Sequence, residues 1–110
     1  MVDVKSIRWI DDRLLLLDQT RLPAEIKILD VTTVHQAIQA IKEMRVRGAP
    51  AIGVTAAYAV ALAARFISHP DREKFLSDLE IACKEVSLAR PTAVNLQWAV
   101  GRMLNTARSL

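Results

Sequence analysis

The sequence has little cysteine and few aromatic side chains. Cys83 is its one cysteine, and aromatic residues make up 5% of the 110 positions. A single cysteine excludes an internal disulfide framework and a cysteine-based structural zinc site, and this usage fits a reducing, cytoplasmic setting. The sequence pI is about 9.4, but there is no run of Lys or Arg and little aromatic surface for stacking bases. We therefore expect no nucleic-acid partner.

Long hydrophobic runs are also missing. The longest uncharged stretch, Gly48 to Ala64, has 17 residues and consists mostly of small side chains, whereas a membrane-spanning helix needs roughly 20. The N-terminus has mixed charge and lacks the basic and apolar regions of a signal peptide. We expect a buried helix in this stretch, and no membrane partner.

What the sequence does contain is enough apolar residues for a core, 52% of a chain of about one domain's length. Its net charge is +3, and this excess is confined to one region. Residues 1–85 hold 12 charges of each sign, whereas the last 25 residues contain Arg90, Arg102 and Arg108 and no acidic side chain. This asymmetry suggests an anionic ligand near the C-terminal part of the chain.

The first thirty residues show strand patterns. Residues 7–10 and 14–17 flank a polar turn and predict a hairpin whose second strand is apolar on both faces. Glu25 to Ile28 alternates with period two, which predicts a third strand with Ile26 and Ile28 facing the core. We expect a small antiparallel sheet of about three strands within residues 7–29.

Four helices are predicted in the remainder, within about residues 33–109. The first is expected to follow an N-cap at Thr32 or Thr33 and to end near Arg45, and the second to run from Pro50 to Phe66. A break at His69-Pro70 and a cap at Asp71 precede the third helix, and the fourth begins at about Ala93. The second helix carries a stripe of small residues that permits close approach of another helix: Ala49, Gly53, Ala57 and Ala61. The fourth is expected to bury Val94, Trp98, Met103 and Leu104. The predicted fold is a single α+β domain over residues 1–110.

Two helix starts share one chemical pattern, an arginine followed by proline in Arg47-Gly48-Ala49-Pro50 and in Arg90-Pro91-Thr92. A helix N-terminus offers unpaired N–H groups and partial positive charge, and an arginine adds a forked donor suited to phosphate. If the two starts converge, they form an anion site from Arg47, the amides of Gly48 and Ala49, and Arg90. The alternative is ordinary proline capping beside solvated arginines.

Other chemical candidates are weaker. His35 and His69 have no second ligand at metal spacing, so no metal is expected, and Cys83 falls on an apolar helix face. The segment Asp18 to Arg21 fits a cleft or plain turn chemistry equally well, and Trp9 and Trp98 are expected as core or interface anchors. No set of acid, base and nucleophile is present, which suggests that a second domain or a partner subunit supplies the chemistry.

Three motifs together resemble one protein family. They are Leu17-Asp18-Gln19-Thr20-Arg21-Leu22-Pro23, the run Met44 to Gly53 containing Arg47-Gly48-Ala49-Pro50, and Arg90-Pro91-Thr92-Ala93-Val94-Asn95-Leu96. The chain is similar over nearly its whole length to methylthioribose-1-phosphate isomerases. Their relatives are the regulatory alpha, beta and delta subunits of eukaryotic translation initiation factor 2B and ribose-1,5-bisphosphate isomerase. Ala59 and Ala89 depart from the family pattern, and Ala89 removes a hydroxyl close to Arg90.

The resemblance implies an intramolecular oxidoreductase of methionine salvage, converting 5-methylthioribose 1-phosphate to 5-methylthioribulose 1-phosphate without a cofactor. It implies that Arg47, Gly48, Ala49 and Arg90 contact the sugar phosphate. It also implies that the catalytic cysteine and aspartate lie in a Rossmann-like C-terminal domain absent from this chain, which would then be inactive alone, and that the complete protein is a homodimer. Three other functions stay open: a regulatory module of the initiation-factor type, a relative of ribose-1,5-bisphosphate isomerase, and an independent anion-binding domain.

Overall fold

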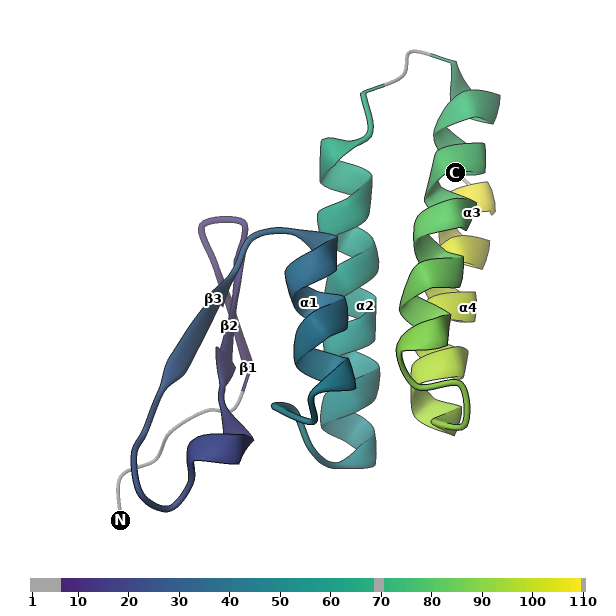
Figure 1. Cartoon of the computed structure of the whole chain (residues 1–110). Coiled ribbons are helices and arrows are strands. Elements are labelled where there is room, and N and C mark those ends of the chain that lie inside the picture. The colour runs from purple at the N-terminus through teal and green to yellow at the C-terminus, as the bar shows by residue number, and fades with distance from the viewer. Residues whose placement is uncertain (1–6, 69–70, 110) are drawn as a thin grey trace.

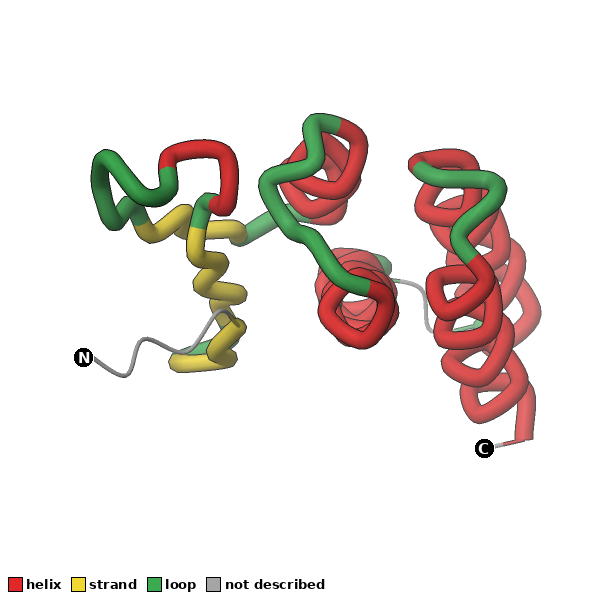
Figure 2. The backbone as a smooth tube through the Cα atoms, turned by 90° about the horizontal axis from the view of Figure 1, so that it is seen from below, coloured by secondary structure: helices red, strands yellow, loops and turns green. Residues whose placement is uncertain are grey.

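The computed structural model describes residues 7–68 and 71–109. The predicted break at His69-Pro70, with His69 itself, lies outside the described residues. The elements form three layers, seen along the helix axes in Figure 2: the β-sheet, then helices α1 and α2, then helices α3 and α4. The predicted α+β class, a small antiparallel sheet followed by four helices, is confirmed (Figure 1).

The sheet is antiparallel with strand order β1-β2-β3. Strand β1, Ile7–Ile10, and strand β2, Arg13–Leu17, form the predicted hairpin. Its two turn residues, Asp11 and Asp12, have φ of 52° and 61°, and short aspartate side chains tolerate this left-handed region in two-residue hairpins. In β2, Leu14 and Leu16 are fully buried, so this strand lies at the centre of the sheet with one apolar face against the helices.

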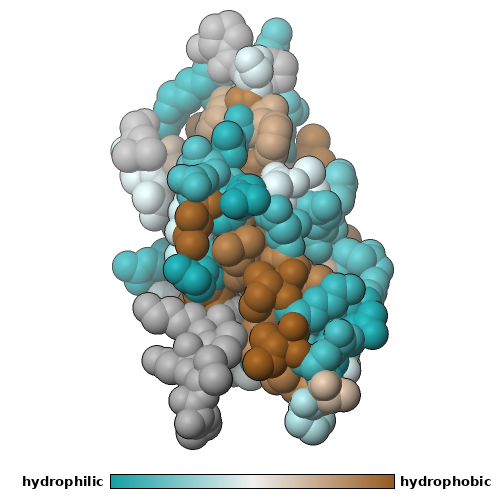
Figure 3. Space-filling model, turned by 90° about the vertical axis from the view of Figure 1, so that its left-hand side faces the viewer, coloured by the Kyte–Doolittle hydropathy of each residue, from teal (hydrophilic) through white to brown (hydrophobic). Residues whose placement is uncertain are grey.

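The third strand differs from the prediction. Strand β3 is Ile28–Val31, and it pairs Leu14 with Val31 and Leu16 with Leu29. Ile26 is 60% exposed and Ile28 is 47% exposed, so the expectation that both face the core is wrong. Because successive side chains of a strand point to opposite faces, the register that turns Leu29 and Val31 toward the helices turns Ile28 outward. Apolar atoms consequently appear on the outer surface when the molecule is viewed from the sheet side (Figure 3).

The helices begin where their capping residues predict. Helix α1, Val34–Lys42, has a capping box in which Thr33 accepts from the amide of Gln36 while the Gln36 side chain accepts from the amide of Thr33. Helix α3, Arg72–Ala89, is capped by Asp71. Helix α2, Ala49–Phe66, has proline in its first turn, and helix α4, Val94–Ser109, begins close to the predicted Ala93. A short 3-10 helix, η1, covers Gln19–Arg21.

Helix α2 lies at the centre of the domain. Trp9 of β1 stacks on its Tyr58 with ring centroids 5.0 Å apart, which makes Trp9 the expected core anchor. On another face, a Cβ added at Gly53 would lie 3.2 Å from the carbonyl oxygen of Asn95 in α4, so the small-residue stripe does permit close helix packing. Among the described helices, α2 alone is long and apolar enough to cross a membrane, but buried core helices pass the same test.

Helix α4 presents a different face to the core than predicted. Val94 is 77% exposed and Trp98 is 63% exposed, so their predicted burial is wrong, while Met103 and Leu104 are partly buried. The buried residues are Leu96, Ala99 and Val100. The apolar pattern fits two neighbouring faces of this helix, and the contacts with α2 and α3 select the one that contains Leu96. Trp98 therefore remains an interface candidate and is not a core residue.

Candidate functional site

Helices α2 and α4 begin at the same end of the molecule. They run in the same direction, from the bottom of Figure 1 upward. Gly53, in the first turns of α2, lies against Asn95, in the first turn of α4, and a groove between the two helices is lined by Pro50, Asn95 and Trp98, among others. The loops that precede both helices face the viewer in Figure 2. The fold thus brings the two predicted arginine-containing segments to one end of the domain.

Gly48 shapes the start of α2. It is the N-cap residue, with φ of 94° and ψ of 136°, and it makes no side-chain cap. This conformation favours glycine, and an added Cβ would meet no atom within 4 Å. Gly48 and Ala49 are exposed, while the first N–H groups of a helix have no acceptor within it. The backbone here is open to an anionic oxygen.

The two arginines differ in how the backbone holds them. Arg47 is exposed in the connection before α2, whereas Arg90 is half-buried as the C-cap of α3. The Arg90 carbonyl accepts from the Ala93 amide at 3.1 Å and from the Gln97 side chain at 3.3 Å, which fixes the turn into α4. Within residues 7–68 and 71–109, neither guanidinium has a hydrogen bond or ion pair, so both are free to bind an anion.

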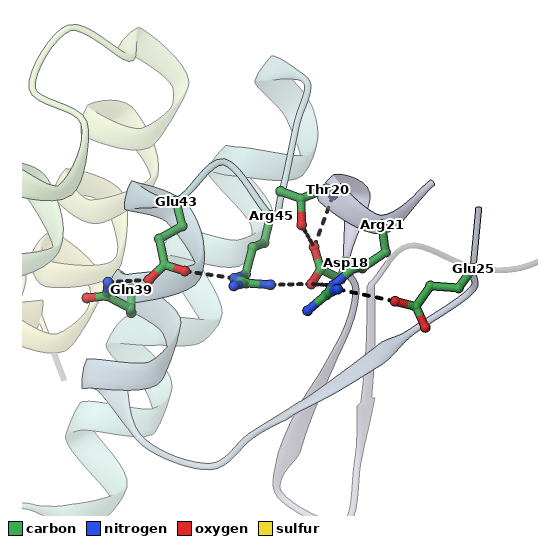
Figure 4. A network of polar contacts seen from close by, with 7 residues as sticks. All are labelled: Asp18, Thr20, Arg21, Glu25, Gln39, Glu43 and Arg45. Carbon is green, nitrogen blue, oxygen red and sulfur yellow. Dashed lines mark hydrogen bonds and ion pairs between the residues drawn. The ribbon is translucent and has the colours of Figure 1, made fainter. Parts of the chain in front are cut away.

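A third arginine, Arg45, is committed to the protein itself. It donates to the carboxylate of Asp18, and its Nε lies 2.9 Å from Oε1 of Glu43. The other carboxylate oxygen of Glu43 accepts from the side chain of Gln39 (Figure 4). The carboxylate of Asp18 is fully buried, and it also accepts from the amide and the hydroxyl of Thr20 at 3.0 and 2.6 Å. This network joins the end of β2 to the connection between α1 and α2.

Asp18 is ionised in this network. Its burial disfavours the charged form and acts to raise the pKa, but the hydrogen bonds from Thr20 and Arg45 outweigh this effect. The pKa of Asp18 therefore lies below its ordinary value of 3.8. The carboxylate and the guanidinium form a charge-assisted pair at neutral pH.

Sequence reasoning missed the pair of Asp18 and Arg45. It left the segment from Asp18 to Arg21 open between a cleft and turn chemistry, and the structure shows the latter, with Asp18 capping η1, combined with a buried ion pair. The available signal was an acidic residue directly after a strand with two apolar faces, a place where a carboxylate needs a partner. The partner is 27 residues away in sequence, which no local pattern reveals.

The remaining candidates do not form a second site. The side chain of His35 is 80% exposed, and its Nδ1 lies 4.0 Å from Glu85. The described residues hold no cluster of ligands that could bind a metal ion. Cys83 is buried, and burial raises the pKa of its thiol, consistent with the predicted inert residue. The guanidinium of Arg102 lies over the ring of Trp98, 5.2 Å from its centroid, as a cation–π contact.

Comparison with known proteins identifies the class to which this fold and site belong. The model of the initiation factor 2 subunit family matches residues 45–110, which include both arginine-containing helix starts. The chain therefore belongs to this family.

The similar proteins within the family carry two kinds of names. Methylthioribose-1-phosphate isomerases from Synechocystis sp. and Pelotomaculum thermopropionicum are 48% and 50% identical over 96% and 94% of this chain. The 5-methylthioribose 1-phosphate isomerase structure from Pyrococcus horikoshii superposes with a TM-score of 0.90 at 35% identity, covering 96% of this chain and 30% of that one. The delta subunit of translation initiation factor eIF-2B from A. fulgidus also gives 0.90, at 39% identity, with 98% and 32% covered. The chain spans about 30% of the length of the curated isomerases it matches.

Proposed function

We propose that this chain is the N-terminal, substrate-phosphate-contacting domain of a methylthioribose-1-phosphate isomerase. The observation that carries the proposal is the shared end of α2 and α4, where Arg47 and Arg90 lie in the loops that precede these helices. The names of the similar bacterial proteins support the substrate class. Under this proposal the complete protein is a cytoplasmic homodimer whose larger C-terminal domain holds the catalytic groups.

The chemistry assigned to this domain is phosphate recognition. The guanidinium groups of Arg47 and Arg90 supply charge-assisted hydrogen bonds to phosphate oxygens, and the amides of Gly48 and Ala49 add donors at the positive end of the α2 dipole. Holding the phosphate fixes the position of the sugar. Ring opening and the transfer of hydrogen between C1 and C2 then require groups supplied from outside these 110 residues.

A second candidate function is a regulatory module, and one observation favours it. The structure of the eIF-2B delta subunit matches this chain with the same TM-score as the isomerase and a slightly higher identity. In a regulatory protein, the same arginines would sense a sugar phosphate or another anion without converting it. Binding alone does not separate the two functions, whereas turnover by the complete protein does.

The phosphate site is tested by titrating the isotopically labelled chain with inorganic phosphate and with 5-methylthioribose 1-phosphate while following the amide resonances of Gly48 and Ala49. We expect both amides to shift, and the Arg47→Ala and Arg90→Ala variants to bind about tenfold or more weakly, because each loses one charged hydrogen-bonding group.

Arg65→Ala is the matched control. Arg65 is an exposed arginine in the last turn of α2, at the end of the helix far from Gly48. It should bind phosphate as the wild type does. Equal affinity in all four proteins would remove Arg47 and Arg90 from the site.

A further inference from the structure

The connection between α1 and α2 has an irregular backbone that needs an anchor. Met44 has φ of 59° and Gly48 has φ of 94°, and a non-glycine residue in this region carries a conformational cost. Met44, Arg47 and Gly48 are exposed, so they contribute little packing. The side chain of Val46 is buried, and the side chain of Arg45 ties the segment to Asp18 at the end of β2.

Arg45 is held through its amide, its carbonyl and its side chain. Its amide donates to the carbonyl of Ala40 at 3.0 Å, and its carbonyl accepts from the amide of Gln19 at 2.8 Å. Its guanidinium binds the carboxylates of Asp18 and Glu43. Two of these attachments lead to the segment that follows β2, so the sheet fixes where the connection runs.

Asp18 is itself rigidly placed. Its amide donates to the carbonyl of Lys27 at 2.8 Å, directly before β3 begins, and its carboxylate accepts from both donors of Thr20. Because this carboxylate is fully buried and Arg45 supplies its closest counter-charge, the pair has one favourable geometry. Removal of one partner from such a pair leaves an uncompensated charge.

We propose that Asp18 is a positioning residue for the anion site and acts through Arg45. Arg45 precedes Arg47 by two residues and Gly48 by three, a span of about 7–10 Å for extended chain. A shift of the Arg45 backbone therefore displaces the guanidinium of Arg47 and the first amides of α2 relative to Arg90. The inference rests on the proposed function, because it assigns Asp18 a role in binding the same phosphate.

The test compares the phosphate affinity of Asp18→Asn with that of the wild type by the same amide titration. Both proteins are measured at pH 7 and at a temperature below the unfolding midpoint of each. Asparagine keeps the shape of the side chain and an acceptor for Thr20 but loses the charge that holds Arg45. We expect affinity to fall about three- to tenfold, less than in Arg47→Ala or Arg90→Ala, because Asp18→Asn displaces the phosphate donors without removing one. Amide hydrogen exchange should accelerate at Gln19 and residues 45–48, and stay unchanged in α3 and α4.

Two controls separate positioning from general stability. Thr33→Ala removes the cap at the far end of α1 and lowers stability without touching the connection. Asp30→Asn breaks an exposed ion pair of the sheet, in which Oδ2 of Asp30 lies 2.8 Å from Nη1 of Arg13. Both should bind phosphate with wild-type affinity. Equal weakening in Thr33→Ala and Asp18→Asn would overturn the proposal, because affinity would then follow stability.

A conservative variant keeps the proposal testable if Asp18→Asn does not fold. Arg45→Lys retains a positive charge for Asp18 but lacks the fork that also binds Glu43, whereas Arg45→Met removes the charge altogether. We expect the phosphate affinity of Arg45→Lys to lie between those of the wild type and Arg45→Met. Wild-type affinity in Arg45→Met or Asp18→Asn overturns the positioning role and leaves the proposed function standing. Failure of the wild-type chain to bind phosphate at Gly48 overturns the proposed function, and the positioning role with it.

Discussion

Thr55 lies in the middle of α2 with its side chain fully buried, and its hydroxyl oxygen has no hydrogen-bond partner among the described residues. A buried hydroxyl without a partner lowers stability, because folding removes its hydrogen bonds to water. The residue therefore reduces the stability of a helix that is otherwise packed almost entirely through apolar side chains.

We predict that Thr55→Val raises stability by about 1 kcal/mol, because it replaces the hydroxyl with a methyl group of similar size. For a domain of this size, that corresponds to an increase of roughly 4–8 °C in Tm, measurable by calorimetry. Thr55→Ser is the control, since it keeps the hydroxyl, removes a methyl group and should lower Tm. A lower Tm for Thr55→Val would show that the hydroxyl is satisfied in solution.

At the scale of elements, the contact between α2 and α4 sets how close the two helix starts lie. It depends on Gly53, where an added Cβ would lie 3.2 Å from the backbone oxygen of Asn95. That atom belongs to the first turn of α4 and cannot move without moving the helix. The small residue at this position therefore serves both the packing and the geometry of the candidate site.

We predict that Gly53→Leu destabilises the domain by about 1–3 kcal/mol, the usual cost of overpacking, and weakens phosphate binding by separating the starts of α2 and α4. Urea unfolding and the phosphate titration check the two effects. Gly101→Ala is the matched control: Gly101 lies inside α4 with no atom within 4 Å of an added Cβ. Since alanine is the better helix former, Gly101→Ala should stabilise by up to about 1 kcal/mol. Unchanged stability in Gly53→Leu would contradict the close contact.

At the scale of the whole molecule, the central fact is that the chain corresponds to about 30% of the curated isomerases. Its candidate anion site offers two arginines and open backbone at Gly48, while the described residues include no metal cluster and their one cysteine is buried. Exposed apolar side chains lie beside the candidate site on α4, at Val94 and Trp98. Under the proposed function, a phosphate-contacting domain of this kind works together with a separate catalytic domain.

We predict that the isolated chain does not turn over 5-methylthioribose 1-phosphate, whereas the Synechocystis isomerase stays active when this chain replaces its matching region. The 48% identity over that region makes the exchange structurally conservative. Introducing Arg47→Ala into the exchanged protein should lower kcat/KM by about tenfold or more, while Arg65→Ala should not. A folded but inactive exchange product would favour the regulatory function, and turnover by the isolated chain would contradict the domain assignment.

Local sequence was sufficient for the elements whose signals are local. The caps at Thr33 and Asp71 mark where α1 and α3 begin, and the polar pair after Ile10 marks the hairpin turn. It was insufficient where two faces of an element are almost equally apolar. The register of β3 and the buried face of α4 depend on which neighbours pack there, and at Ile28 and Trp98 the packing selected the other face.

The sequence by itself determined the α+β class and the presence of an arginine before each of two helix starts, because caps, periodicity and neighbouring residues are properties of short segments. Only the tertiary structure decided that α2 and α4 begin at one end, and that Arg45, unlike Arg47, is held by the buried carboxylate of Asp18. The physical reason is distance along the chain. Contacts between residues tens of positions apart arise from how layers pack, and no local pattern encodes which distant partner a charge will meet.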